Sequence, residues 1–151
     1  MVDVTEKQPT PRLARAQASV RLGRKLAALI QRSGALAKGN VLETARLAGI
    51  QAAKHTATLI PLCHPLLLDV VEIHVEIVGE RAVIETLARA RAATGVEMEA
   101  MTAAAVAALT VYDMCKAASK GISIEVVRLL EKSGGRSGHW QRKESNRGRT
   151  D

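Results

Sequence analysis

Two charged residues late in an alanine-rich segment are the strongest candidates for acid–base chemistry. Asp113 and Lys116 stand three residues apart, so they share one face if this segment is a helix. A neighbouring acid and base can move protons in both directions, and each shifts the pKa of the other. The same spacing is typical of an ordinary surface ion pair. One detail points toward function: the macrodipole disfavours a carboxylate in the C-terminal half of a helix, so Asp113 stands against a local preference.

Two glutamates open the same segment. Thr94 followed by Glu97 matches a capping box, which gives Glu97 a structural role. Glu99 has no such role, so it either stabilises the helix N-terminus by its charge or contacts a ligand. The 14 residues between Glu99 and Asp113 correspond to roughly 21 Å along a helix axis. If both residues serve one small substrate, they must come from different chains, which favours an oligomer.

Cys63 and His64 lie in a loop between two prolines, Pro61 and Pro65. The pair has three interpretations: metal ligands, a nucleophile with its base, or loop packing. Adjacent residues rarely bind one zinc ion together, and no second Cys/His cluster has zinc spacing. Neighbours in sequence usually point apart, which disfavours a catalytic dyad. A neutral His64 that hydrogen-bonds a ligand is therefore the functional alternative to a histidine that caps the loop backbone, and we predict no metal site.

Several basic residues are candidates for binding phosphate. The segment from Lys132 to Gly138 is rich in glycine and serine, so its backbone N–H groups could surround a phosphate while Lys132 adds charge. The segment lacks Walker spacing, and such chain ends are also common linkers. Lys38 and Lys54 are further cations that either meet phosphate or are simply solvated.

Composition sets limits on the class of protein. The chain has 151 residues, no Phe, one Tyr and one Trp, so one domain must build its core from Ala, Val, Leu and Ile. Such a core buries little area per residue, and association of subunits is one way to add buried area. The net charge of +7 includes +4 from residues 132–151. This excess fits a phosphorylated substrate or weak nucleic-acid contact and does not choose between them.

The chain lacks the sequence features of secretion. Cys63 and Cys115 are too few for a disulfide scaffold. No apolar signal segment follows Met1, and no apolar run approaches the length of a membrane span. We expect a cytosolic, cytoplasmic protein with reduced thiols.

Hydrophobic periodicity predicts an α+β chain. Strands are expected from Ala16 to Leu22, from Asp69 to Val78, back from a Gly79–Glu80 turn through Leu87, and from Ile122 to Leu130. Helices are expected from Lys25 to Arg32, from an Asn40 cap to about Ala52, and from Thr94 to about Ser119. This order predicts a ferredoxin-like βαββαβ two-layer sandwich with an antiparallel sheet and helices on one face. Residues 1–138 form the single domain, with a loose arm at 1–13 and a polar, mobile tail at 139–151.

The sequence strongly resembles the molybdenum cofactor biosynthesis protein C family, the cyclic pyranopterin monophosphate synthases. The resemblance runs from Met1 to about Gly138, and its matching stretches are 1–4, 45–54, 59–66, 94–100, 112–116 and 127–130. The segments around Cys63-His64, Glu97 and Asp113 are long, ordered and correctly spaced, so a chance match is excluded.

The resemblance implies a homohexamer, a trimer of dimers, with active sites at subunit interfaces. It implies a lyase that converts (8S)-3′,8-cyclo-7,8-dihydroguanosine 5′-triphosphate to cyclic pyranopterin monophosphate and releases pyrophosphate. Asp113 matches the family's catalytic acid/base and Lys116 its partner. The residues that match substrate contacts are Leu62, Cys63, His64, Met98 and Glu99, with Lys38 and Lys132 as basic residues suited to the triphosphate. No organic cofactor is implied, although a divalent cation on the substrate phosphates is compatible with the chemistry.

Three positions depart from the family pattern. Asn40 stands where Asp is frequent, Ala93 where a Lys is common, and Arg136 where Lys is usual. The change at 93 removes one cation, which Arg89 or Arg91 would have to replace. A rival function is nucleic-acid binding, but the expected strands contain no aromatic residue for stacking bases. A catalytically dead family member is a second rival, against which the intact Asp113–Lys116 pair argues.

Overall fold

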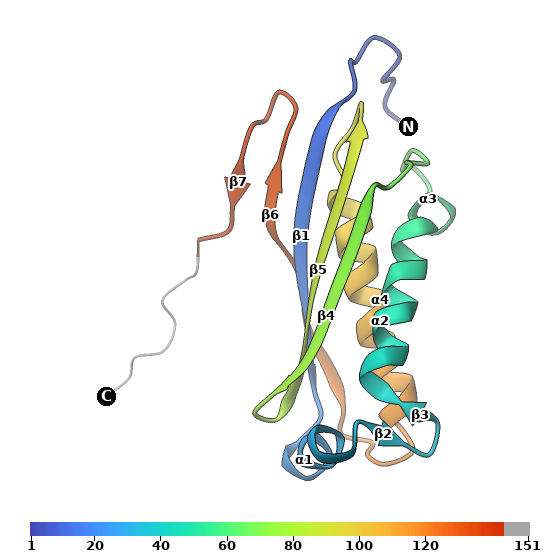
Figure 1. Ribbon diagram of the computed structural model, residues 1–151, viewed down its shortest axis with the longest axis vertical. Coiled ribbons are helices and arrows are strands. Elements are labelled where there is room, and N and C mark those ends of the chain that lie inside the picture. Colours follow the sequence, from blue (N-terminus) through green and yellow to red (C-terminus); the bar gives the residue numbers. More distant parts are fainter. Residues whose placement is uncertain (144–151) are drawn as a thin grey trace.

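The chain folds into an antiparallel sheet with its two long helices on one face, as the computed structural model shows for residues 1–143 (Figure 1). The elements in chain order are β1 (Thr10–Arg21), α1 (Arg24–Ser33), β2 (Ala35–Leu36), β3 (Gly39–Asn40), α2 (Val41–Lys54), α3 (Thr56–Leu59), β4 (Val70–Val78), β5 (Arg81–Ala92), α4 (Glu97–Cys115), β6 (Ser123–Ser133) and β7 (Trp140–Gln141). The predicted α+β class is confirmed.

The main sheet has five strands in the order β4-β5-β1-β6-β7. The first strand in sequence, β1, lies inside the sheet, where Ala18 pairs with Ile84 of β5 and with Val127 of β6. All four neighbouring pairs of strands are antiparallel. The predicted hairpin at Gly79–Glu80 joins β4 to β5, and Gly79 has a φ of 59°. Two further residue pairs form the small β2–β3 ribbon.

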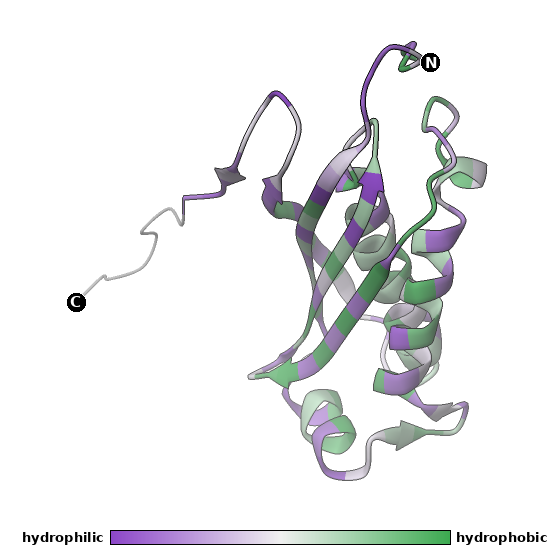
Figure 2. Ribbon diagram, turned by 45° about the horizontal axis from the view of Figure 1, so that its top comes forward, coloured by the Kyte–Doolittle hydropathy of each residue, from purple (hydrophilic) through white to green (hydrophobic). Residues whose placement is uncertain are grey.

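Alternation along the strands decides which face the helices cover. In β1, Ala14, Ala16, Ala18 and Val20 are fully buried, whereas the residues between them are only partly buried. The colours in Figure 2 alternate along the long strands in the same way. Because successive side chains of a strand point to opposite faces, one face becomes apolar and the other polar.

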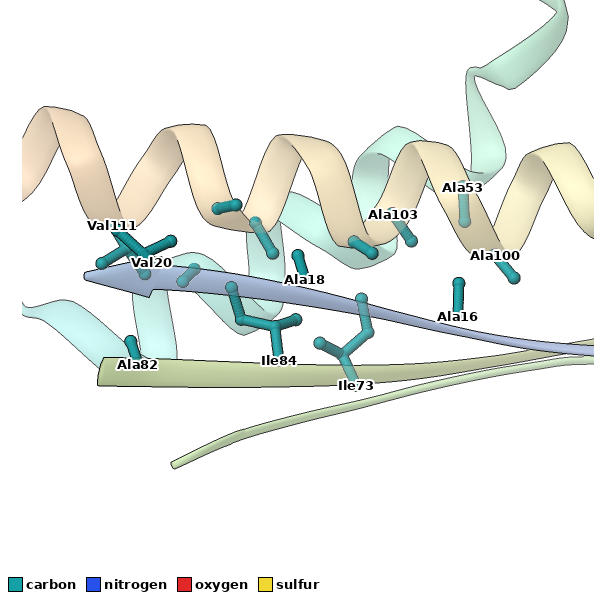
Figure 3. Packing of buried hydrophobic residues seen from close by; sticks show 14 of the residues in the cluster. Ala16, Ala18, Val20, Ala53, Ile73, Ala82, Ile84, Ala100, Ala103 and Val111 are labelled. Atoms are coloured by element: carbon teal, nitrogen blue, oxygen red, sulfur yellow. The ribbon is translucent and has the colours of Figure 1, made fainter. Parts of the chain in front are cut away.

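Small side chains let helix α4 lie close to the sheet. Buried alanines of β1 and α4 face each other, with a few larger residues such as Ile84 filling the space between them (Figure 3). The closeness is also evident from a buried hydrogen bond of 2.8 Å, in which the hydroxyl of Thr86 in β5 donates to the carbonyl of Ala100 in α4. The predicted core of Ala, Val, Leu and Ile is thus observed.

Helix α2 packs against α4 at a glycine. A Cβ atom on Gly49 would collide with the end of the Ile73 side chain and would lie 3.0 Å from the carbonyl oxygen of Ala103. The two helices approach this closely because position 49 has no side chain.

Two helix ends follow local sequence signals, whereas α4 lacks its predicted cap and ends at Cys115 rather than near Ser119. The side chain of Asn40 caps α2 by accepting a hydrogen bond from the N–H of Glu43 at 3.0 Å, as predicted. Helix α1 stops at Gly34, which has a left-handed φ of 69°. The prediction of a capping box at Thr94–Glu97 is wrong, because α4 begins after Val96 and its N-terminus has no side-chain cap.

The strands extend beyond their predicted limits at both ends of the chain. Strand β1 begins at Thr10, inside the expected loose arm, and β6 continues to Ser133. Trp140 and Gln141, expected in a mobile tail, form β7 and pair with Lys132 and Glu131. The rest of the tail prediction, residues 144–151, lies outside the described residues. No helix of residues 1–143 combines the length and apolar character of a membrane span.

Candidate functional site

The C-terminal end of α4 carries a carboxylate between two lysines. Lys116 Nζ lies 2.6 Å from Asp113 Oδ1, and Lys38 Nζ lies 2.7 Å from Asp113 Oδ2. Lys38 also donates to the backbone carbonyl of Asp113 at 3.2 Å. Asp113 lies in the last turn of α4 and Lys116 is its C-cap residue, so their i, i+3 spacing brings the two side chains together. Lys38 reaches them from the turn between β2 and β3, 75 residues earlier in the chain.

The two lysines fix the ionisation state of Asp113. Hydrogen bonds from Lys116 and then from Lys38 lower its pKa to about 2. The hydrogen bond to Asp113 raises the pKa of Lys116 in turn. At neutral pH Asp113 is therefore an ionised carboxylate paired with protonated Lys116. Because the lowered pKa makes Asp113 a weak base and the raised pKa makes Lys116 a weak acid, the pair is held in its charged form in this arrangement.

A pocket of about 320 Å³ lies near the other end of α4, at the start of the helix. Its wall contains the predicted residues Leu62, Cys63, His64, Met98 and Glu99. Leu62 and Met98 present apolar side chains with 70% and 38% of their surface exposed. The structure thus brings together the five residues that the resemblance gave as substrate contacts.

Glu99 is the buried carboxyl group of this pocket, with 4% of its surface exposed. Burial raises its pKa, and the charge of Glu97 adds to the rise. Burial followed by the charge of Glu99 also raises the pKa of the Cys63 thiol. A raised pKa keeps this thiol protonated, which argues against Cys63 as a nucleophile. Both cysteines are free, and no cluster of three His, Cys, Asp or Glu side chains suited to a metal occurs in residues 1–143.

The N-terminal segment forms another part of the pocket wall. Val2, Val4 and Lys7 line the pocket, although sequence reasoning placed residues 1–13 in a loose arm. The segment is folded by local hydrogen bonds, because Asp3 accepts from the N–H and the hydroxyl of Thr5 at 2.9 and 2.7 Å. These hydrogen bonds from Thr5 lower the pKa of Asp3.

A second, more basic pocket of about 650 Å³ adjoins the first, and Lys7, Thr94, Gly95 and Glu97 line both. Its cations are Lys7, Arg12, Lys132 and Arg136. Lys132 Nζ forms an ion pair with Glu97 Oε1 at 2.9 Å, so Glu97 pairs with a lysine instead of completing a capping box. Arg89 and Arg91, the suggested substitutes for a lysine at position 93, are absent from its lining.

The predicted site residues therefore fall into two groups at opposite ends of α4. Lys38, Asp113 and Lys116 lie at the end near the β2–β3 ribbon, and the pocket residues lie at the end near α3 and the N-terminus (Figure 1). Glu99 and Asp113 both belong to α4, and 14 residues of helix rise separate them by roughly 21 Å. Within one chain the members of each group lie close together, but the two groups remain apart.

Sequence reasoning missed Lys7 and Arg12 as residues of the basic pocket. Both are basic residues in or near the N-terminal arm, close to Pro9 and Pro11. Their positive charge was the only feature of the sequence that could have indicated a role in binding an anion. Their position depends on the pairing of Thr10 with Ala92, which places the start of β1 next to the segment before α4.

An acid–base cluster on a helix end, together with a basic pocket, is typical of enzymes that bind anionic ligands. The sequence matches the MoaC family over residues 1–135. The match covers most of the 151-residue chain, and the chain belongs to the MoaC family. The family works in molybdenum cofactor biosynthesis, which supports a role for this chain as an enzyme of that pathway.

Proposed function

We propose that the chain is a cyclic pyranopterin monophosphate synthase. In this proposal it converts (8S)-3′,8-cyclo-7,8-dihydroguanosine 5′-triphosphate to cyclic pyranopterin monophosphate and releases pyrophosphate. The observation that carries the proposal is the placement of Asp113 between Lys38 and Lys116 in a chain of the MoaC family. The α+β fold, with an antiparallel sheet and two long helices on one face, supports the proposal of a ferredoxin-like subunit.

In the proposed mechanism the Asp113 cluster moves protons during the ring rearrangement. Asp113 is in the ionised form that a general base requires, and Lys116 is in the protonated form that a general acid requires. Both act when bound substrate separates the pair, because their contact lowers the pKa of Asp113 and raises that of Lys116. The lysines offset charge that develops on the phosphates as pyrophosphate leaves. No organic cofactor takes part in this scheme, and a divalent cation bound to the substrate phosphates is compatible with it.

The pocket at the start of α4 supports a binding role. Leu62 and Met98 offer apolar surface for a pterin-like ring, while His64 and Glu99 offer polar groups. The adjoining cations, including Lys132, suit the triphosphate. Because the Asp113 cluster lies at the opposite end of α4, a complete site requires a second chain, which supports a homo-oligomer with shared sites.

The proposal is tested by incubating the full-length protein with the cyclic dihydroguanosine triphosphate and detecting products by mass spectrometry. Cyclic pyranopterin monophosphate and pyrophosphate should form in equal amounts, and Asp113→Asn should form neither at a comparable rate. A folded wild-type oligomer that leaves the substrate unchanged would contradict the proposal and favour a catalytically dead family member.

Nucleic-acid binding finds no comparable support. The four long strands, β1, β4, β5 and β6, contain no aromatic residue. Trp140 lies on the short strand β7, contrary to the expectation that no strand contains an aromatic residue. A single aromatic side chain on a two-residue strand is not the stacking surface that sheet-based RNA recognition uses.

A further inference from the structure

The side chain of Arg12 lies where three segments of the chain meet. Its Nε donates to the carbonyl of Ala92 and its Nη2 to the carbonyl of Ala93, each at 3.3 Å. Ala92 is the last residue of β5, and Ala93 leads into the Thr94–Gly95 segment before α4. The partly buried guanidinium thereby ties the start of β1 to this segment.

The glycine-rich segment after β6 lies against the same guanidinium. Gly134 and Gly135 both have left-handed φ values, 106° and 68°. A Cβ atom on Gly135 would collide with the guanidinium of Arg12, and one on Gly134 would collide with the carbonyl of Pro11. Glycines at these positions let the backbone approach Arg12 more closely than any other residue type would allow.

The charges around Arg12 point to an anionic ligand. Lys7, Lys132 and Arg136 line the same pocket as Arg12, and its carboxylates are Glu6 and Glu97. Lys132 has a carboxylate partner in Glu97, whereas no carboxylate of residues 1–143 forms an ion pair with Arg12. The cations of this pocket outnumber its carboxylates, so an anionic ligand would offset the excess positive charge.

We propose that Arg12 is a positioning residue that holds the glycine-rich segment 134–137 against residues 92–95 and so shapes a polyphosphate-binding surface. The inference deepens the proposed function, on which it rests for the identity of the substrate. Held this way, Lys132 and Arg136 line one pocket together with Gly135 and Ser137 of the glycine-rich segment. Arg12 also places a positive charge next to Ala93.

Two variants disturb this contact from its two sides. Arg12→Lys keeps the charge but loses the planar fork that reaches both carbonyl groups. Gly135→Ala keeps Arg12 and places a methyl group against the guanidinium. Gly138→Ala is the matched control, because Gly138 also has a left-handed φ, 63°, but a Cβ there would meet no atom within 4 Å.

The first measurement is calorimetric titration of each full-length variant with pyrophosphate, followed by steady-state kinetics with the cyclic nucleotide. Arg12→Lys and Gly135→Ala should each weaken pyrophosphate binding about tenfold or more, because each disturbs contacts to a charged group. Both should raise KM and change kcat by no more than about threefold, since the Asp113 cluster is untouched. Gly138→Ala should bind like the wild type.

A double-mutant cycle with Arg12→Ala, Gly135→Ala and the double variant Arg12→Ala/Gly135→Ala distinguishes loss of this contact from a general loss of folding. If the methyl group acts through the guanidinium, the effect of Gly135→Ala should largely disappear when Arg12 is already absent. Additive effects in this cycle would overturn the inference, as would Arg12→Lys binding pyrophosphate within about twofold of the wild type. Equal effects of Gly135→Ala and Gly138→Ala would also overturn it, because backbone strain would then explain both.

The binding measurement does not depend on turnover. A wild type that binds pyrophosphate through Arg12 but leaves the nucleotide unchanged would reject the proposed function and support the positioning role. A wild type that forms product, together with an Arg12→Lys variant that keeps the wild-type affinity for pyrophosphate, would support the proposed function and reject the positioning role of Arg12.

Discussion

Asp113 is an exposed carboxylate whose pKa is set by two neighbouring lysines rather than by burial. Its side chain is 52% exposed, and its pKa nevertheless falls to about 2. Lys116 is fixed by the helix, while Lys38 comes from the turn between β2 and β3. The protonation state of Asp113 therefore depends on the position of that turn.

Removing Lys38 should raise the pKa of Asp113. Lys38→Ala removes one of the two hydrogen bonds that lower this pKa, so it should move from about 2 toward the ordinary value of 3.8. Only four aspartates occur in the chain, so ¹³C-labelled aspartate and NMR can follow the titration of each carboxyl group. Lys25→Ala, which removes an exposed lysine of α1, is the control and should leave it unchanged. A titration of Asp113 that is identical in both variants would contradict the charge cluster.

Replacing either member of the Asp113–Lys116 pair should abolish most activity. General acid–base groups contribute about 10²–10⁴-fold, and we expect losses in this range for Asp113→Asn and Lys116→Ala at saturating substrate. Both side chains are about half exposed, so the oligomer should stay folded, which size-exclusion chromatography and circular dichroism can verify. Near wild-type turnover in one of the variants would remove that residue from the mechanism.

The buried, charged side chain of Glu99 should lower the free energy of unfolding at neutral pH. Its folded-state pKa is raised above the ordinary 4.5 by burial, so folding disfavours its charged form. Below pH 4.5 the group is protonated in both states and the cost vanishes, whereas above the raised pKa the full cost applies. Glu99→Gln should therefore raise Tm at pH 7 and lose this advantage in acid, while activity falls.

Glu97→Gln is the control for that experiment. The Glu97 carboxylate pairs with Lys132, so its replacement should not stabilise the protein at pH 7. Equal increases in Tm for both variants would mean that the charge of the first turn, rather than the burial of Glu99, is responsible.

The elements were predictable from sequence where polarity alternates and less so where it does not. Strand β4 alternates clearly, and its predicted start differs from the observed one by a single residue. Strand β7 has only Trp140 and Gln141, too short for any period, and is formed by pairing with β6. The start of α4 was predicted at the wrong residue because Thr94 and Glu97 have capping-box spacing. In the structure Val96 is the N-cap, and the Glu97 side chain accepts a hydrogen bond from Lys132, 35 residues away.

The contact between α2 and α4 should be sensitive to a side chain at position 49. Gly49→Val places bulk against Ile73 and the backbone of Ala103, and we expect a loss of about 1–3 kcal/mol in the free energy of unfolding. Urea denaturation measures the loss. Gln51→Val puts the same residue type on an exposed position of α2 and is the control. A wild-type midpoint for Gly49→Val would show that the helices can separate at little cost.

At the scale of the whole molecule, sequence reasoning could pair Asp113 with Lys116 but could not place Lys38 next to them. The first pair depends only on helix periodicity. The second depends on how the β2–β3 ribbon meets the end of α4, a tertiary contact with no local signal. The separation of Glu99 from Asp113 was predictable, because it follows from helix rise alone.

Active sites shared between chains should appear in a mixing experiment. Asp113→Asn and Glu99→Gln chains are each expected to be inactive. After subunit exchange, sites that take Glu99 from one chain and Asp113 from another should regain function, in about one quarter of all sites for an equal mixture in a symmetric assembly. Activity is measured after mixed oligomers have been verified by mass spectrometry. Verified mixtures without recovery would assign Glu99 a structural role at the helix N-terminus.

Trp140 gives the molecule an optical reporter at one place. It is the only tryptophan in the chain, is 40% exposed on β7, pairs with Lys132, and has the Arg142 guanidinium 5.7 Å above its ring. Its fluorescence should therefore respond when an anion binds near Lys132. The alanine-lined core contains no fluorophore, so emission and far-UV circular dichroism should follow two different events, movement of the β6–β7 hairpin and melting of the helices.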